Sequence, residues 1–247
     1  MGYRMNERLP LIHAAPENSG LYKELYNLAA KEVSCGLKIV RFPKNRILRM
    51  MIKGEVDFYP GFNFTEERAS YAYYFDNGLP GGGDVGISRA SLPEITNLGD
   101  LTGRIVLESL GGPDYYSQLN DVRVRRPPDL TLDKAVDIIR KKAADFYIYN
   151  RITIEYFLKS QEVTDIKIHQ NCCGGSMPLY MAFSRHSPHF KEVVNQNYDP
   201  TKLMSIENFP TTVSKTTIAY KFFQALNRLA NTGGTGSLAE KYYYGSN

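Results

Sequence analysis

The sequence has no tryptophan, only 3 cysteines and only 4 histidines in 247 residues. It also has no uninterrupted apolar segment near the roughly 20 residues that a helix needs to span a bilayer. The cysteines lack the Cys-x-x-Cys spacing of common zinc sites. The sequence therefore gives no sign of a membrane span or of a cysteine-based metal site.

Motifs that mark common catalytic sites are missing as well. There is no Gly-x-Ser-x-Gly elbow, no Gly-x-x-x-x-Gly-Lys-Ser/Thr phosphate loop and no His-Glu-x-x-His zinc motif. Residues 81–86 have the glycine spacing of a dinucleotide-binding loop, but they lead into an extended segment rather than a helix. His186 and His189 could suggest a metal, although helix capping and solvent exposure explain them more simply. We therefore expect no catalytic residue, no metal and no cofactor.

The charge pattern gives no sign of a nucleic-acid partner. The formal net charge is +4, and the densest basic groups are Arg123, Arg125 and Arg126, then Arg140, Lys141 and Lys142. Neither group alternates with aromatic residues, so both are expected on solvated surfaces. With 43% hydrophobic and 23% charged residues, the chain is typical of a soluble globular protein of one large domain or two lobes.

Cysteine usage and the N-terminus leave the cellular compartment open. We expect Cys35, Cys172 and Cys173 to be buried, inert thiols, with a Cys172–Cys173 bond as the lesser alternative. An odd number of cysteines leaves at least one unpaired if all bonds are intramolecular. The first four residues do not form a signal peptide, so the protein is cytosolic or a signal peptide has been removed and replaced by a start codon.

Strands and helices are expected to alternate in the first 60 residues. The expected strands cover residues 9–14, 37–42 and 56–59, with helices at 19–35 and 46–53 between them. A β-α-β-α-β unit of this kind has parallel strands joined by right-handed crossovers. The N-terminal part of the chain should therefore be an α/β lobe.

The same alternation begins again after the glycine-rich residues 81–86. Strands are expected at 104–107, 122–125 and 145–149, with helices at 111–119 and 132–142. The remaining expected elements are a helix at 152–159, strands at 166–170 and 179–184, helices at 188–196, 215–231 and 237–244, and a loop or insertion at 199–213. A second β-α-β-α-β unit predicts a second lobe.

Arg68 occupies an unusual position for a cation. Thr65 is expected to cap a helix that follows strand 56–59, with Glu66 and Glu67 in its first turn. The helix dipole disfavours a cation there by roughly 0.3 to 1 kcal/mol. Arg68 is therefore a candidate to bind a carboxylate or phosphate together with backbone N–H groups. The alternative is that it pairs with Glu66, Glu67 or a neighbouring loop.

Seven segments carry a family resemblance over nearly the whole chain. They are Gly54-Glu55-Val56-Asp57, Thr65-Glu66-Glu67-Arg68 with Tyr74-Phe75, residues 97–106, Gly111-Gly112, Ala143-Ala144-Asp145-Phe146, residues 179–184, and residues 233–242. In this order and spacing they resemble the extracellular solute-binding protein family 3, the amino-acid-type periplasmic binding proteins of ABC transporters.

The resemblance implies a two-lobed α/β fold, the type II periplasmic binding protein-like fold. Each lobe would be a mostly parallel sheet flanked by helices, and a two-strand hinge would join them, with crossings near residues 86–88 and 180–184. We expect lobe 1 to comprise residues 1–86 and 184–247, and lobe 2 residues 87–183. The ligand would lie in the inter-lobe cleft, beyond the carboxyl ends of the strands.

The resemblance also implies a set of ligand-binding residues in lobe 1. An arginine after the third strand grips the ligand's α-carboxylate in this family, and Arg68 matches its position. Pro60, Gly61 and Asn63 match the family's contacts to the same end of the ligand. His13 ends the first expected strand and could also reach the cleft.

In lobe 2, Gly111 and Gly112 match a loop whose backbone N–H groups complete the carboxylate site, unless they only form a tight turn. Aromatic side chains near expected strand ends are further candidates to stack on the ligand. They are Tyr59, Phe62, Tyr115, Tyr147 and Tyr149. Alternation along residues 146–149 predicts that one set of these aromatics belongs to the core.

Asn150 is a further ligand-binding candidate, because its side chain can accept a hydrogen bond from an amine, but it departs from the family pattern. Many of these binding proteins have an aspartate here that pairs with the ligand's ammonium group. A charge-assisted hydrogen bond is worth roughly 1.5 to 3 kcal/mol, against about 1 for a neutral one. Either Glu108 or Glu17 supplies the missing charge, or the ligand is a carboxylate without an amine.

The implied function is therefore capture of a small carboxylate-bearing ligand, an amino acid or relative, for an ABC importer. The protein would be a periplasmic monomer without catalytic activity, closing its lobes on the ligand and presenting the closed form to a permease. Two alternatives remain. One is the ligand-sensing domain of a signalling receptor, and the other is a cyclohexadienyl dehydratase-like enzyme, for which Glu108 would be the acid.

Overall fold

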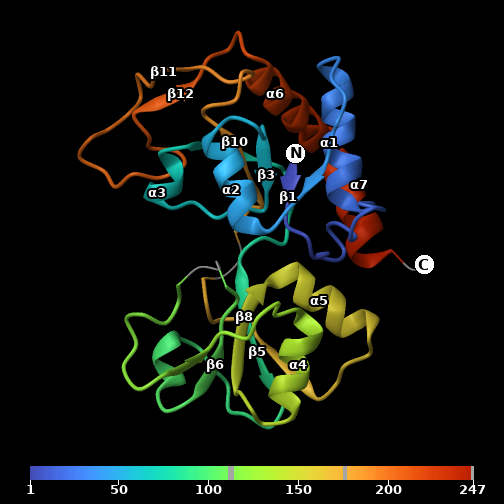
Figure 1. The fold of residues 1–247 in the computed structure, drawn as a ribbon, viewed down its shortest axis with the longest axis vertical. Helices are drawn as coiled ribbons and strands as arrows, with labels where there is room; N and C mark the ends of the chain where they lie inside the picture. Colours follow the sequence, from blue (N-terminus) through green and yellow to red (C-terminus); the bar gives the residue numbers. More distant parts are fainter. Residues whose placement is uncertain (111–113, 175–176, 246–247) are drawn as a thin grey trace. The chain divides into compact units, whose positions relative to one another are not determined.

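Two compact units make up the chain in the computed structural model, which describes residues 1–110, 114–174 and 177–245 (Figure 1). Unit 1 comprises Met1–Pro80 and Pro178–Asn247, and unit 2 comprises Gly81–Met177. The chain thus passes between the units earlier than expected on both occasions. Residues 86–88 and 180–184, where hinge crossings were expected, lie instead within sheet strands of unit 2 and unit 1 respectively.

The strands of unit 1 combine parallel and antiparallel pairing. Strand β1 (Gly2–Tyr3) pairs in parallel with β2 (Val40–Arg41). Strand β10 (Tyr180–Ser184) lies between β3 (Phe58–Pro60) and β4 (Ala72–Asp76), antiparallel to both. Because β10 hydrogen-bonds to both of these strands, it belongs to unit 1, although it was expected in lobe 2.

The first expected strand, at residues 9–14, is wrong. Arg8 and Ile12 form an isolated bridge in a tight turn, and the first strand is formed by Gly2 and Tyr3. Leu11 and Ile12 are fully buried, so their apolar character reflects a loop that packs into the core rather than a strand. A short run of apolar residues is typical of a buried strand, and here the same run belongs to a buried loop.

Helices of unit 1 pack over an aromatic core. They are α1 (Leu21–Glu32), α2 (Lys44–Ile52), α3 (Glu66–Ala69), α6 (Ile218–Asn231), α7 (Gly234–Ala239) and the short π-helical segment η2 (Glu240–Tyr244). Helix α1 lies against α6 and α7 (Figure 1). The Tyr26 ring of α1 packs 5.0 Å from Phe58 of β3 and 6.3 Å from Phe222 of α6, measured between ring centroids.

The expected helix at 188–196 is also wrong. Strand β11 (Glu192–Val194) pairs antiparallel with β12 (Thr211–Val213), which ends the segment expected as a loop. Arg185 fixes this pair of strands, because its guanidinium forms an ion pair with Glu192 and donates to the Thr211 hydroxyl at 2.9 Å. Long-range partners therefore decide the conformation of this polar segment.

Unit 2 contains a mixed sheet of strand order β7-β6-β8-β5-β9. Its strands are β5 (Asp84–Arg89), β6 (Ile105–Leu107), β7 (Arg123–Arg125), β8 (Phe146–Asn150) and β9 (Ile166–His169). Strands β7, β6 and β8 are parallel, whereas β5 is antiparallel to both of its neighbours. The helices are the 3₁₀ turn η1 (Leu98–Leu101), α4 (Leu132–Arg140) and α5 (Arg151–Ser160). Residues 114–119 form no helix, and 111–113 lie outside the described residues.

The two faces of this sheet form separate apolar clusters. Tyr147 of β8 packs in one cluster with α4, while its neighbours Phe146 and Ile148 pack in the other. This is the alternation expected of a strand that is buried on both faces. Tyr147 is 1% exposed, so it belongs to the core.

The cysteines differ from the expectation of three inert thiols. Cys172 and Cys173 form a disulfide, and Cys35 is a free thiol. Cys172 is fully buried in the second cluster of unit 2, beside Phe146 and Ile148. The lesser alternative is therefore the one observed.

His169 is a buried histidine whose two ring nitrogens both have hydrogen-bond partners. Its Nδ1 accepts a hydrogen bond from the Ile95 N–H at 2.9 Å, and its Nε2 lies 2.8 Å from the Ser88 hydroxyl. Burial lowers the pKa of His169, although the Glu94 carboxylate, 3.2 Å from Nδ1, opposes the shift, and Lys167 adds to it. Protonation of Nδ1 would remove the acceptor that the Ile95 N–H uses.

Unit 2 should therefore lose stability as the pH falls. The unfolded chain binds a proton at His169 more readily than the folded chain, so this contribution is fully present above the unfolded pKa and is lost as the pH drops through the folded one. Urea unfolding at pH 7.5 and pH 5 measures this effect. Between these pH values the free energy of unfolding should fall more for the wild type than for His169→Asn, whose side-chain oxygen can replace the Nδ1 acceptor. Equal losses in the two proteins would contradict this role.

Candidate functional site

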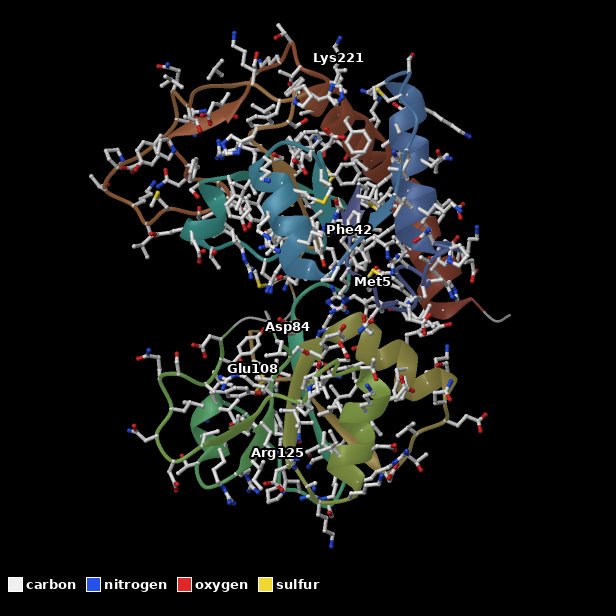
Figure 2. All side chains as sticks on the ribbon, in the orientation of Figure 1. Met5, Phe42, Asp84, Glu108, Arg125 and Lys221 are labelled. Atoms are coloured by element: carbon white, nitrogen blue, oxygen red, sulfur yellow. A yellow bond between two sulfur atoms is a disulfide. The ribbon has the colours of Figure 1, made fainter. Side chains whose placement is uncertain are left out.

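Strands β1, β2 and β3 end at a common edge of unit 1. Tyr3, the last residue of β1, stacks on Tyr59 near the end of β3, with 5.2 Å between ring centroids. Met5 and Phe42, which follow β1 and β2, lie at the same end of the unit (Figure 2). Ligands of open α/β sheets bind beyond the carboxyl ends of strands. We call this region, residues 4–6, 42–43 and 61–68, the carboxyl-end edge.

Arg68 lies at this edge in the conformation that the sequence predicts. Thr65 caps α3, its hydroxyl accepting the Arg68 N–H at 3.2 Å. The Arg68 guanidinium donates to the Asn63 carbonyl oxygen at 3.0 Å and lies 4.3 Å from the centroid of the Phe62 ring. Within the described residues it has no carboxylate partner, so it pairs with neither Glu66 nor Glu67. Its remaining N–H groups suit a carboxylate.

The Phe62 ring packs against the guanidinium of Arg68. Only 2% of the residue is exposed, and its ring packs 5.4 Å from Tyr59 and 6.4 Å from Tyr74. A cation over an aromatic face contributes about 0.5 to 1 kcal/mol at exposed sites and more when desolvated. Phe62 is thus a platform that positions the guanidinium, rather than an open face for a ligand.

The loop after β3 uses its own backbone groups internally. Pro60 pairs with Met181 in the sheet, and the Gly61 N–H donates to the Tyr180 carbonyl oxygen at 2.8 Å. The Asn63 carbonyl accepts both from Arg68 and from the Tyr74 hydroxyl, each at 3.0 Å. The Asn63 side chain is exposed. The Gly61 N–H is therefore engaged within the protein, whereas Asn63 is exposed at the surface of this loop.

Arg41 holds the long loop that follows β1. Its guanidinium donates to the carbonyl oxygens of Met5, Asn6 and His13, at 3.0 to 3.1 Å, and to the Asn18 side chain. Burial lowers the pKa of Arg41 below its usual value. His13 is about half-exposed in this loop, with Nδ1 3.9 Å from Glu17 and 4.0 Å from Glu7. It lies in the loop and not at a strand end.

Two further arginines at this edge were missed in the sequence. Arg4 directly follows β1, and Arg8 lies beside Gly61, 3.3 Å from the position that a Cβ on that glycine would take. Assigning β1 to residues 9–14 moved the expected strand end away from Arg4. A strand of two residues shows no alternation of apolar and polar residues. The only sequence signal for β1 is therefore that it precedes the first helix, α1.

Acidic and hydroxyl groups lie at one edge of the unit 2 sheet. Asp84, which begins β5, and Glu108, which follows β6, lie at the same end of that sheet (Figure 2). Glu108 binds Arg126 through both carboxylate oxygens, at 2.9 and 3.4 Å, and Tyr115 donates to Asp84. The ion pair with Arg126 occupies Glu108, which was a candidate for the missing charge and for a catalytic acid. Gly111 and Gly112 lie outside the described residues.

Asn150 is buried, and its side chain has structural partners. Its Oδ1 caps α5, accepting the Thr153 N–H at 3.3 Å and the Thr153 hydroxyl at 3.1 Å, and its Nδ2 donates to the Gly83 carbonyl oxygen at 3.2 Å. An asparagine is among the best N-cap residues, which explains its place after β8 without a ligand.

Asn150→Ala should lower the free energy of unfolding by about 1 to 2 kcal/mol, because the cap of α5 and the bond to Gly83 are both lost. Asn150→Asp retains the capping acceptor and should cost less. Urea unfolding of the two variants tests this. An alanine variant as stable as the aspartate variant would show that the cap contributes little.

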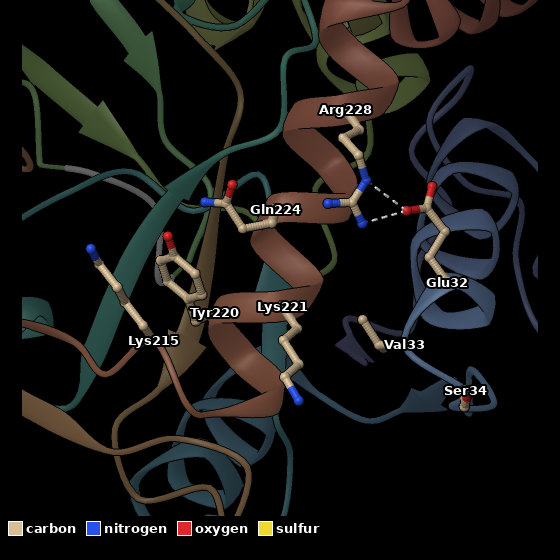
Figure 3. A pocket seen from close by; sticks show the side chains of 8 residues that line it. All are labelled: Glu32, Val33, Ser34, Lys215, Tyr220, Lys221, Gln224 and Arg228. Atoms are coloured by element: carbon tan, nitrogen blue, oxygen red, sulfur yellow. Dashed lines mark hydrogen bonds and ion pairs between the residues drawn. The ribbon is translucent and has the colours of Figure 1, made fainter.

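Other features do not add a site to these edges. Within the described residues there is no group of three or more metal-ligating side chains, and no helix is long and apolar enough to cross a membrane. A surface pocket of about 480 Å³ lies between α1 and α6, where Arg228 pairs with Glu32 at 2.6 Å (Figure 3). A second pocket, of about 280 Å³, is lined by Met1 before β1 and Asp57 before β3, so it lies at the opposite end of these strands.

The solved structures similar to this chain include several binding proteins. The GluR0 ligand-binding core from Nostoc punctiforme, in complex with L-glutamate, is 15% identical, with 99% of this chain and 98% of that chain covered and a TM-score of 0.73. A P235GK mutant of the ArgBP of T. maritima is 18% identical over 98% of this chain and 93% of that chain, with a TM-score of 0.69. The substrate-binding protein of an amino acid ABC transporter is 14% identical over 98% of this chain and 97% of that chain, with a TM-score of 0.68.

No family model and no curated protein sequence matches the chain. The similarity is therefore one of structure, and at these identities it establishes the fold. The expected fold class is confirmed, since both units of the chain are covered in each of these comparisons. The chain has the two-lobed periplasmic binding protein-like fold of amino-acid-binding proteins.

Proposed function

We propose that this protein is a solute-binding protein that takes a small carboxylate-bearing ligand at the carboxyl-end edge of unit 1. Arg68 carries the proposal, because it lies on the Phe62 platform at this edge without a carboxylate partner among the described residues. A guanidinium presents paired N–H donors that match a carboxylate in geometry and charge. The fold supports the proposal independently, since its structural neighbours are amino-acid-binding proteins.

The proposed ligand class follows from Arg68. Arg68 favours a carboxylate, and an amino acid or relative is the simplest such ligand. Asn150 is engaged in capping α5 and Glu108 in an ion pair, so neither explains recognition of an amine. We therefore propose a requirement for the carboxylate and none for the ammonium group.

We also propose that the protein is exported, that it is a monomer and that it delivers its ligand to an ABC permease. The Cys172–Cys173 disulfide supports a location outside the reducing cytosol, such as the periplasm. One structural neighbour is the substrate-binding protein of an amino acid ABC transporter, which supports a permease partner. The ligand-binding core of GluR0 is also similar in fold, with a TM-score of 0.73 against 0.68, and it keeps ligand sensing as the second candidate.

A thermal-shift screen over amino acids, organic acids and polyamines tests the proposal. A ligand at 100 times its dissociation constant should stabilise the folded protein by about 2.7 kcal/mol. We expect carboxylates to raise the unfolding temperature and polyamines without a carboxylate to have no effect. If only polyamines stabilise the protein, the ligand class is wrong. Turnover of prephenate-like compounds would instead support the dehydratase alternative.

A further inference from the structure

Four fully buried side chains of unit 1 carry polar atoms that lack a hydrogen-bond partner within the described residues. They are Tyr3 of β1, Tyr22 and Tyr26 of α1, and Asn77, which follows β4. The unpartnered atoms are the three tyrosine hydroxyls and both polar atoms of the Asn77 amide. Each of these residues is 0% exposed, so bulk water cannot replace the missing partners.

These polar groups belong to one cluster. The Tyr22 ring lies 6.0 Å from Tyr3 and 5.7 Å from Tyr26, centroid to centroid. Burial raises the pKa of both Tyr22 and Tyr26, and in each case the hydroxyls of Tyr3 and Tyr243 reinforce the shift. Asn77 is close enough to Tyr26 to lower the pKa of that hydroxyl, but the two groups do not meet at hydrogen-bonding geometry.

Leaving such groups unpaired would be costly. A buried donor or acceptor without a partner costs about 1 to 3 kcal/mol, and native proteins satisfy the large majority of them. A folded chain holds about one buried water per 27 residues, and each makes about three hydrogen bonds to polar groups of this kind. Buried hydroxyls and an amide without a protein partner suit such bridging molecules.

We infer that the hydroxyls of Tyr3, Tyr22 and Tyr26 and the Asn77 amide form an internal hydration site that holds ordered water molecules. The ligand is water, bound as both donor and acceptor, because tyrosine hydroxyls and an amide offer both functions. We call these four side chains and their waters the hydration site.

The hydration site lies behind the loop that carries Arg68. The Tyr22 hydroxyl is 2.7 Å from the position that a Cβ on Gly61 would occupy. Asn77 begins the segment that leaves unit 1. In that segment the carbonyl oxygen of Pro80, the last residue before unit 2, accepts a hydrogen bond from the Tyr243 hydroxyl at 3.2 Å. The hydration site thus includes one side chain next to the start of the β3–α3 loop and one at the start of the segment that leads out of the unit.

A high-resolution crystal structure of the full chain tests the site directly. We expect at least one ordered water within hydrogen-bonding distance of two or more of the polar atoms. A structure in which the hydroxyls and the amide bond only to one another, with no water among them, would overturn the inference.

Tyr22→Phe and Tyr26→Phe give a second test whose sign is diagnostic. If water bonds these hydroxyls, each substitution removes a hydrogen bond and should lower the unfolding temperature by a few degrees. A raised unfolding temperature in both variants would mean that the hydroxyls are dry and unpaired, and would overturn the inference. Tyr244→Phe is the matched control, because Tyr244 is 63% exposed and its substitution should change nothing.

Discussion

Replacing Arg68 by alanine should weaken binding of the most stabilising carboxylate roughly ten- to a hundredfold. A hydrogen bond to a charged group contributes about 1.5 to 3 kcal/mol, and each 1.4 kcal/mol changes a dissociation constant about tenfold. The Phe62 ring and the Asn63 carbonyl hold the guanidinium in place before the ligand arrives, which reduces the entropy lost on binding. Isothermal titration of the wild type and the variant with the same carboxylate measures the difference.

Two further variants make this experiment specific. Arg68→Lys keeps the charge but loses the planar pair of donors, so its affinity should fall between those of the wild type and the alanine variant. Arg140→Ala is the matched control, because Arg140 lies on α4 of unit 2 and pairs with Asp165 at 2.7 Å on an exposed surface. Arg140→Ala should leave the affinity for the carboxylate unchanged. If Arg68→Ala binds as tightly as the wild type, Arg68 does not hold the carboxylate.

Local signals explain why the Arg68 helix could be predicted from the sequence. A short apolar strand, then a threonine, then two acidic residues indicate the start of a capped helix. All of these signals lie within a few residues of one another. The amphipathic α4 was predictable for the same reason, and so was most of the alternation of strands and helices in both units. The strand expected at residues 9–14 and a helix over residues 114–119 are not found. Arg68 itself drew attention because a cation in the first turn contradicts the local electrostatic preference.

The features that could not be predicted depend on contacts between distant residues. Strand β1 consists of two residues and exists because β2, 38 positions away in the Gly2↔Val40 pair, aligns with it. Strand β11 forms through β12 and Arg185, and the local sequence resembles a helix start. Asn150 matched a ligand-binding position through the family resemblance. In the structure its amide is engaged by Thr153 and by Gly83, the residue before β5. A resemblance gives a position in the chain, whereas the hydrogen-bond partners of a side chain depend on the fold around it.

Gly86→Ala should destabilise unit 2 by about 2 to 3 kcal/mol. Gly86 lies in β5, paired with Ile148 on one side and His169 on the other, so the backbone cannot shift freely. A Cβ on this residue would lie 2.6 and 2.7 Å from the Cε1 and Cε2 atoms of Phe146, and nearer still to Cζ. Phe146 is fully buried, and overpacking of this kind typically costs 1 to 3 kcal/mol, occasionally more. Urea unfolding gives the change in free energy.

The steric cause can be separated from the loss of glycine by a second-site change. Phe146→Leu removes the ring atoms that the new methyl group meets, so the double variant should be more stable than the sum of the two single changes predicts. Gly236→Ala supplies the opposite control, because Gly236 lies within helix α7 with no atom within 4 Å of the added Cβ, and alanine favours a helix by about 0.5 to 1 kcal/mol. Strict additivity of Gly86→Ala and Phe146→Leu would show that the Phe146 ring does not press on this face of β5. A positive coupling would mean instead that glycine is required at residue 86 for close packing in the centre of a sheet, and not for flexibility at a hinge.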